Sequence, residues 1–212
     1  MESPTNGRYR NMEGYDTPAN SAARVEHPPG LTLEQYAKAK GLTVDFLSAL
    51  GLSTIFLNGL PALRIPYHSL DGSEAAISFR VAMQSYNHFR WKSGSNPCLY
   101  GLSKLPEAEA AGFINLVESP SDCQTLWYHE MPALGLPCGG TWRAEWAKHL
   151  ERIPIIYVPA RAGTGINRGW FAVSAIRDRL HLIEIPDGKD VSALYLSNLK
   201  PSRFSTRLGC GH

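Results

Sequence analysis

Residues 113–122 read Phe-Ile-Asn-Leu-Val-Glu-Ser-Pro-Ser-Asp. The first five of them form a short, almost continuous apolar run, which is typical of a strand buried on both faces of a sheet. Glu118 follows the run directly. Ser121 is a good cap for a helix over Cys123–Tyr128, so Asp122 is expected in the opening turn of that helix. The stretch therefore predicts a buried strand that ends in one carboxylate, with a second carboxylate one turn later.

Similar apolar runs downstream predict the remaining strands of the same sheet. They lie at Ala133–Leu136, Ile153–Val158 and Leu180–Ile185. Helices are expected between them, over Trp142–Leu150 and Arg168–Ile176. Continuous apolar strands joined by crossover helices form a parallel sheet flanked by helices. The predicted fold class for this part of the chain is therefore α/β, with a mainly parallel sheet.

The chain before residue 99 predicts a small mixed α/β unit that begins with a helical pair. Thr32 and Gln35 form a capping box for a first helix that ends at Gly41, and a second helix follows from Thr43. Two short helices of this kind can form a helix-turn-helix DNA reader. A packing unit is the better interpretation, because residues 44–50 contain no Arg, Lys, Asn or Gln to read base edges.

A period of two follows the helices. Strands are expected over Leu63–Tyr67 and Ala75–Arg80, and Asp71-Gly72 between them is the turn signal of a β-hairpin. His88–Lys92 is expected to be a third short strand. The predicted divisions of the chain are a flexible tail (1–28), a small basic α/β subdomain (29–98), the parallel-sheet domain (99–197) and a C-terminal tail (198–212).

Composition limits the classes of function. The chain has 212 residues, of which 43% are hydrophobic, so it can build a core, and its net charge of +2 says little about partners. It has no long apolar run and does not start like a signal peptide, so we expect no membrane association and a cytoplasmic location. Its four scattered cysteines predict reduced thiols, with neither a disulfide framework nor a zinc site.

The residues that follow each strand form the candidate site, because open parallel sheets bind ligands at the carboxyl ends of their strands. Glu118 and Asp122 follow the first strand and can hold Mg²⁺ through their oxygens. Gly139-Gly140-Thr141 follows the second strand, and its backbone N–H groups can cradle a phosphate. Lys189-Asp190 follows the fourth strand on the same edge.

Together these segments resemble the TOPRIM domain of bacterial, phage and plasmid DNA primases. The apolar strand with Glu118, three residues, Asp122 and an apolar helix is similar to the first TOPRIM signature. Gly188-Lys189-Asp190 resembles the Lys-Asp segment after the last core strand, and residues 89–92 and 97–102 resemble the segment that joins the basic subdomain to TOPRIM. The resemblance covers about residues 30–197. It implies a TOPRIM-like fold, a metal-linked general acid or base at Glu118, Mg²⁺ as the cofactor and a role in DNA replication.

One signature of that family is missing. TOPRIM domains carry an Asp-x-Asp pair after the third strand, where this chain reads Pro159-Ala160-Arg161. A cation near the other acids repels Mg²⁺ and can pair with the carboxylates itself, whereas two-metal phosphoryl transfer needs oxygen ligands around both ions. Glu118, Asp122 and Asp190 remain as metal ligands, which predicts weak Mg²⁺ binding or none, and favours an inactive protein over an active enzyme. No Cys or His cluster precedes residue 60, so no zinc module is expected.

Two of the predicted strands alternate cations with aromatic residues. Arg80, Arg90 and Lys92 alternate with aromatic neighbours that include Trp91, and the alternation is expected to put all three cations on one face. A solvated basic face over an apolar one gives the same pattern. The functional interpretation is a groove for single-stranded DNA or RNA, with Arg80, Arg90, Trp91, Lys92 and Lys189 as its contacts.

Three hypotheses for function follow. The leading one is a primase-like protein that binds single-stranded nucleic acid, is linked to replication of a phage or mobile element, and has replication proteins as further partners. The second is an active Mg²⁺-dependent nucleotidyltransferase or nuclease that uses Glu118, Asp122 and Asp190. The third is a protein-binding module or inhibitor built on a TOPRIM scaffold.

Overall fold

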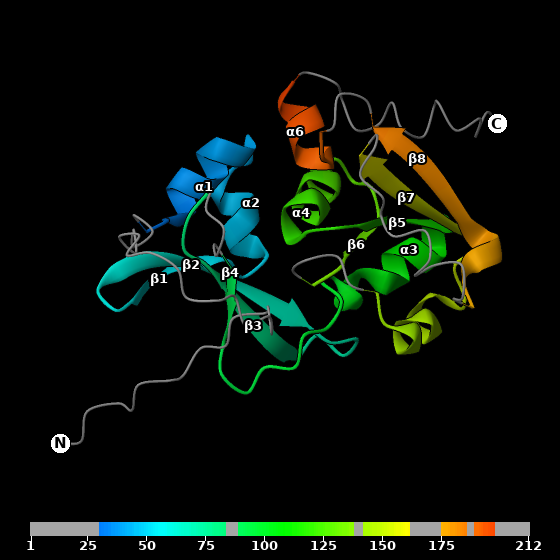
Figure 1. Cartoon of the computed structure of the whole chain (residues 1–212), viewed down its shortest axis with the longest axis horizontal. Coiled ribbons are helices and arrows are strands. Elements are labelled where there is room, and N and C mark those ends of the chain that lie inside the picture. The colour runs from blue at the N-terminus through cyan, green and yellow to red at the C-terminus, as the bar shows by residue number, and fades with distance from the viewer. Residues whose placement is uncertain (1–29, 84–88, 138–141, 162–174, 186–188, 198–212) are drawn as a thin grey trace, which may run out of the picture.

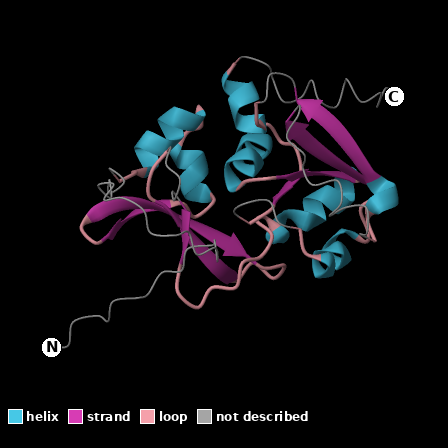
Figure 2. Cartoon of the chain, viewed as in Figure 1, coloured by secondary structure: helices cyan, strands magenta, loops and turns pink. Residues whose placement is uncertain are grey.

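The computed structural model describes residues 30–83, 89–137, 142–161, 175–185 and 189–197. Two four-stranded sheets make up two halves that lie side by side, each with its own helices (Figures 1 and 2). The predicted tails over 1–28 and 198–212 lie outside the described residues. Within these residues, none of the helices has the length and apolar character needed to cross a bilayer.

The small half contains the predicted helical pair and hairpin. Its elements are α1 (Leu33–Lys40), α2 (Val44–Ala49), β1 (Ser53–Leu57), β2 (Leu60–His68), β3 (Glu74–Arg80) and β4 (Phe89–Trp91). The capping box at Thr32 is present, and α1 ends at Gly41 with a φ of 65°. The strands pair antiparallel in the order β1-β2-β3-β4. Strand β1 was not predicted from the sequence; it forms the edge of the sheet and pairs with β2.

The second half is the predicted parallel sheet. Its strands are β5 (Phe113–Val117), β6 (Ala133–Gly135), β7 (Ile155–Arg161) and β8 (Leu180–Ile185), in the order β6-β5-β7-β8, and all neighbours pair parallel. The helices and 3-10 turns are η1 (Leu102–Lys104), α3 (Leu105–Ala111), α4 (Pro120–Tyr128), η2 (Ala144–Leu150), η3 (Arg177–Arg179) and α6 (Val191–Leu196). The helix predicted over Trp142–Leu150 is a 3-10 segment, and the one predicted over Arg168–Ile176 lies almost wholly outside the described residues.

Helix α4 begins three residues earlier than predicted. Its cap is Ser119, whose hydroxyl accepts a hydrogen bond from the N–H of Asp122, while Ser121 lies inside the helix. Pro120 occupies the first helical position, where its fixed φ suits the helix and its missing N–H costs nothing. Asp122 therefore lies in the opening turn, as predicted.

A continuous hydrophobic core joins the two halves. Leu47 and Leu63 of the small half belong to the same buried cluster as Leu126 of α4 and Leu194 of α6. A second cluster lies within the parallel-sheet half and includes Leu116. Burial of this kind stabilises by roughly 25 cal/mol for each Å² of apolar surface removed from water, so separating the halves would be costly. The domain division at residue 98 stays a prediction.

Candidate functional site

Asp122 is buried at the carboxyl edge of the parallel sheet, and both of its oxygens accept hydrogen bonds. The Ser119 hydroxyl donates to Oδ2 at 2.8 Å, and the backbone N–H of Ser192 donates to Oδ1 at 3.0 Å. The side chain is only 3% exposed. Ser192 lies in the first turn of α6 and Asp122 in the first turn of α4. This hydrogen bond therefore joins the N-termini of the two helices.

The second acid of this edge, Asp190, caps α6. Its Oδ1 accepts a 2.7 Å hydrogen bond from the N–H of Ala193. Lys40 arrives from α1 in the other half and donates to the Ser192 hydroxyl at 2.7 Å. The sequence did not single out Lys40, because a lysine in the last turn of a helix is common and favourable by itself.

The pKa of Asp122 is raised to about 6, first by burial and second by the nearby charge of Asp190. The hydrogen bonds from Ser119 and Ser192 and the charge of Lys40 act in the opposite sense. Desolvation therefore outweighs the favourable contacts, as expected for a carboxyl group taken out of water.

Glu118 differs from Asp122, because its side chain is only half-buried. It follows β5 directly, and within the described part of the chain its side chain has no hydrogen bond or ion pair. Strand β7 runs beside β5, with Asn115 paired to Tyr157. Continued in parallel, this register brings Pro159 and Ala160 level with Val117 and Glu118.

The departure from the TOPRIM signature lies inside a strand. Pro159-Ala160-Arg161 forms the end of β7 and pairs with residues 183–185 of β8, so this strand starts two residues later and ends three residues later than predicted. Whether Arg161 pairs with the acids, as the sequence predicts, concerns a side chain outside the described ones. Among the described residues, no three His, Cys, Asp or Glu side chains gather to hold a metal ion. Asp122 and Asp190 already accept internal hydrogen bonds, and Pro159-Ala160-Arg161 adds no carboxylate, so the described residues offer few oxygen ligands for a two-metal centre.

Two other predicted contacts are the phosphate loop and Lys189. The phosphate loop Gly139-Gly140-Thr141 lies outside the described residues. Lys189 is half-buried next to Asp190, at the same edge as Asp122.

The prediction that Arg80 and Arg90 share one face is wrong. In the β3–β4 pair, Phe79 lies opposite Arg90, and Arg80 lies opposite Phe89. Residues directly opposite each other in an antiparallel pair project from the same face. Each strand does alternate as predicted, but the register matches the cation of one strand with the aromatic ring of the other.

Arg80 faces the helices and is buried. It donates from Nε to the carbonyl of Ala82 at 3.1 Å and from Nη2 to that of Met83 at 2.8 Å. Its guanidinium stacks on Tyr36, 5.5 Å from the ring centroid, and on Phe89 at 5.1 Å. Trp91 on the same face is 5% exposed. Arg80 and Trp91 therefore form part of the core of this half.

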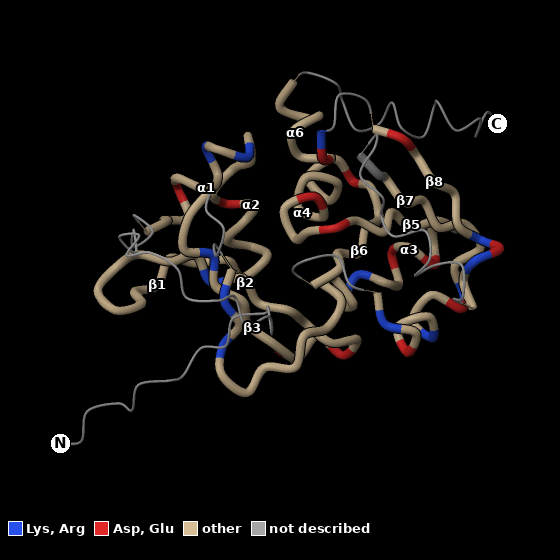
Figure 3. The backbone as a smooth tube through the Cα atoms, in the orientation of Figure 1, with Lys and Arg blue, Asp and Glu red and all other residues tan. Residues whose placement is uncertain are grey.

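The opposite face of the small sheet carries the accessible cations. Arg64, Phe79 and Arg90 form one row across the three strands β2, β3 and β4. Lys92 is exposed two residues beyond Arg90, and Arg90 lines a pocket of about 420 Å³. Figure 3 shows Lys and Arg gathered along these strands, with Asp and Glu gathered around α4.

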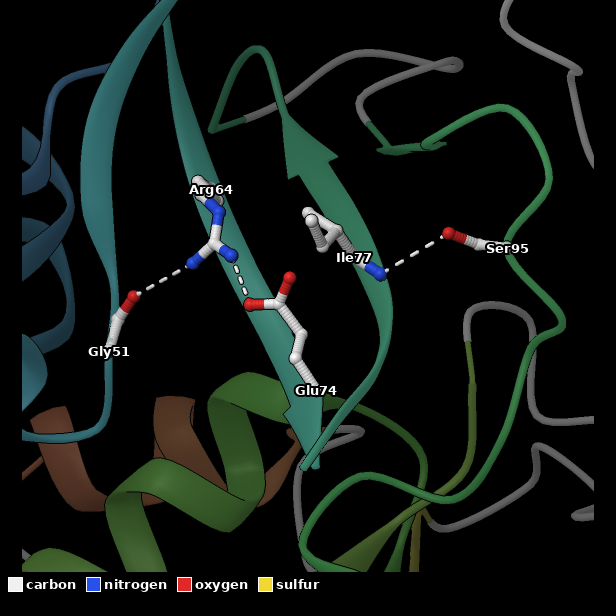
Figure 4. A network of polar contacts seen from close by, with 5 residues as sticks. All are labelled: Gly51, Arg64, Glu74, Ile77 and Ser95. Atoms are coloured by element: carbon white, nitrogen blue, oxygen red, sulfur yellow. Dashed lines mark hydrogen bonds and ion pairs between the residues drawn. The ribbon is translucent and has the colours of Figure 1, made fainter. Parts of the chain in front are cut away.

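Arg64 is engaged within the protein. It forms an ion pair with Glu74 and hydrogen-bonds the Gly51 carbonyl, as Figure 4 shows. In the same view Ser95 accepts a hydrogen bond from the Ile77 N–H, which holds the segment after β4 against β3. Arg90 and Lys92 are thus the cations of this face with the greatest freedom to meet a ligand.

A buried polar bridge joins the two halves behind the site. The Tyr36 hydroxyl donates to Gln124 Oε1 at 2.6 Å, and Gln124 Nε2 donates to the Tyr100 hydroxyl at 3.0 Å. The three side chains are at most 3% exposed. We call this group the Gln124 bridge. It links α1 to α4, the helix that carries Asp122, and nothing in the local sequence patterns pointed to it.

This architecture is a primase-type TOPRIM fold: a parallel sheet in the order β6-β5-β7-β8, flanked by helices and preceded by a small antiparallel sheet with two helices. The similar solved structures are primase catalytic cores. The primase fragment of the bacteriophage T7 primase-helicase is 13% identical, with a TM-score of 0.64 over 90% of this chain and 82% of its own. The Escherichia coli primase catalytic core is 15% identical, with a TM-score of 0.63 over 82% and 71% of the two chains.

A DnaG primase catalytic domain bound to single-stranded DNA is also similar. It is 15% identical, with a TM-score of 0.64 over 87% of this chain and 73% of that chain. No family model matches the sequence, and no curated protein matches it. Likeness at such low identity establishes the fold, and the activity has to be argued from this chain's own residues.

Proposed function

We propose that this chain is a primase-like protein that binds single-stranded nucleic acid in the DNA replication of a phage or mobile element, and that its metal site is degenerate. The observation that carries the proposal is the hydrogen bonding of the Asp122 carboxylate. Both of its oxygens accept hydrogen bonds from the protein itself, and the neighbouring strand ends in Pro159-Ala160-Arg161. Hydrogen bonds from within the protein leave this carboxylate fewer lone pairs to offer a metal ion.

The nucleic-acid part of the proposal is supported by the cations of the small sheet. Arg90 and Lys92 lie on the face that points away from the core, with Phe79 beside Arg90. Phe79 is only 6% exposed, so the two cations carry this part of the proposal, and they suit the phosphates of a single strand. The similar DnaG domain, in its own structure, is bound to single-stranded DNA.

Fluorescence anisotropy with a labelled single-stranded oligonucleotide at two salt concentrations tests this proposal. We expect Arg90→Ala with Lys92→Ala to weaken binding and to flatten the log–log salt slope by about 0.7 for each phosphate that the protein no longer neutralises. Lys148→Ala with Arg152→Ala is the matched control, because it removes the same charge from exposed positions in the other half. Equal effects of the two pairs would show that only net charge matters.

The alternative function, an active Mg²⁺-dependent nucleotidyltransferase or nuclease, is favoured by Glu118. This side chain stands at the end of β5 without an internal partner among the described residues. Calorimetry with Mn²⁺ separates the two functions, and we expect no tight binding by the wild type. Pro159→Asp with Arg161→Asp should create a measurable metal site, because the pair removes one positive charge and adds two negative ones. Tight binding by the wild type would support the enzyme instead.

A further inference from the structure

Lys40 connects the small half of the protein to the acidic edge of the parallel sheet. It is the last residue of α1, and its Nζ donates to Ser192 Oγ at 2.7 Å. The N–H of Ser192 donates in turn to Asp122 Oδ1 at 3.0 Å. Ser192 is fully buried and Asp122 nearly so, which shields this chain of contacts from water.

Two like charges share this buried edge. Asp190 disfavours the ionised form of Asp122, whereas Lys40 favours it. Asp122 is buried and Asp190 is half-buried, and neighbouring carboxylates taken out of water need a cation or a proton to compensate them. In a metal site a divalent ion supplies that charge. Here the cation in place is a lysine from the other half of the chain.

The hydrogen bonds at this edge are supplied in the same way. Asp122 accepts from the Ser119 hydroxyl and the Ser192 N–H, and Asp190 accepts from the Ala193 N–H. Each of these bonds uses a lone pair that could otherwise bind a metal ion. The protein itself thus supplies this edge with a positive charge and with hydrogen-bond donors.

We propose that Lys40 is the built-in counter-ion of the Asp122–Asp190 pair and supplies the charge that a divalent metal would otherwise bring. The inference rests on the proposed function, since it gives the reason why the metal site is degenerate. It also makes the site dependent on the contact between the halves, because Lys40 belongs to one half and both acids to the other. The ammonium suits this role as a compact charge on a flexible stem.

A double-mutant cycle measured by urea unfolding tests the charge pairing. Lys40→Met keeps the stem and removes the charge, while Asp122→Asn keeps the shape of the acceptor. We expect Lys40→Met to raise the unfolding equilibrium constant about tenfold in the wild type and less than about threefold beside Asp122→Asn. Lys38→Met, at an exposed position two residues earlier on α1, is the matched control and should change neither.

An equal effect of Lys40→Met in both backgrounds overturns the proposal. If Asp122→Asn does not fold, Asp190→Asn serves as the second background. It removes the other negative charge of the pair, and asparagine can still cap α6. The same reduction in the effect of Lys40→Met is expected there, and an undiminished effect again overturns the proposal.

Mn²⁺ calorimetry on the same variants tests the exchange of metal for lysine. We expect Lys40→Met to bind Mn²⁺ at least about fivefold more tightly than the wild type, because one opposing charge has gone, and Lys38→Met to show no gain. No gain for Lys40→Met overturns the exchange. The result is separable from the proposed function, because an absence of oligonucleotide binding in the anisotropy assay would reject that function and leave the coupling between Lys40 and Asp122 standing.

Discussion

The Gln124 bridge gives a prediction whose size follows from the structure. Gln124→Leu replaces the amide with an apolar side chain of similar volume, and it leaves the Tyr36 and Tyr100 hydroxyls without their shared partner. A buried hydroxyl without a partner costs roughly 1–3 kcal/mol. Ser121 lies near the Tyr36 hydroxyl and offsets part of this cost. We therefore expect Gln124→Leu to lower the free energy of unfolding by about 3 kcal/mol.

Urea unfolding followed by circular dichroism measures this decrease. For a chain of this length, about 3 kcal/mol corresponds to a drop in Tm of roughly 6–12 °C. Tyr195→Phe is the control, because its hydroxyl donates to the Gly41 carbonyl near the surface, where water can replace it. That change should cost less than about 1 kcal/mol.

Variants that also remove the unsatisfied tyrosine hydroxyls give the decisive comparison. If the cost of Gln124→Leu comes from unsatisfied hydroxyls, adding Tyr36→Phe should recover about 1 kcal/mol or more, because replacing both partners with apolar groups restores a consistent core. Adding Tyr100→Phe should recover more. Two results would refute the reasoning. One is a free energy of unfolding for Gln124→Leu within about 0.5 kcal/mol of the wild type, and the other is a double variant that is less stable than Gln124→Leu alone.

Three further predictions concern other buried groups. Arg80→Met should lower the free energy of unfolding by about 2–4 kcal/mol, because two carbonyls are left without a charged donor, whereas Lys92→Ala should leave it within about 0.5 kcal/mol in the same urea assay. The raised pKa of Asp122, about 6 against 3.8, means that its contribution to stability is present below about pH 4 and is lost as the pH rises through 6. As the pH rises across this range, the free energy of unfolding of the wild type should fall by up to about 3 kcal/mol relative to that of Asp122→Asn. Parallel pH dependences of the two proteins would contradict the raised pKa. Gly101→Ala should destabilise by about 1–3 kcal/mol in thermal unfolding, because Gly101 has a φ of 98° and an added Cβ would lie 2.5 Å from the Trp127 ring; an unchanged Tm would contradict this.

Several features of the fold could be predicted from the sequence because their causes are local. The apolar run at Phe113–Val117 forms a strand with the predicted limits, and Asp122 lies in the opening turn that follows. The capping box at Thr32 and the left-handed Gly41 define the first helix by contacts within a few residues. Alternating runs and helices set the parallel sheet in the same way, since crossover connections leave few other arrangements.

The accessible basic surface could not be predicted, because it depends on how strands pair. Period-two alternation correctly separates Arg80 from Phe79 within β3. Which of the two faces the helices is decided by the register, and a shift of one residue exchanges the faces. The register puts Arg80 inside the core and Arg90 outside it. Arg80, a predicted phosphate contact, is therefore a buried residue that hydrogen-bonds backbone carbonyls.

The state of the acidic site was likewise decided by tertiary structure. The sequence placed Glu118 and Asp122 at the edge of the sheet and showed that the Asp-x-Asp pair is missing. It carried no sign that Asp122 would accept from the start of α6, 70 residues away, or that Lys40 would reach the same helix from 152 residues away. Such contacts arise from the packing of α1, α4 and α6 around one core, and a local pattern of residues holds no information about distant partners.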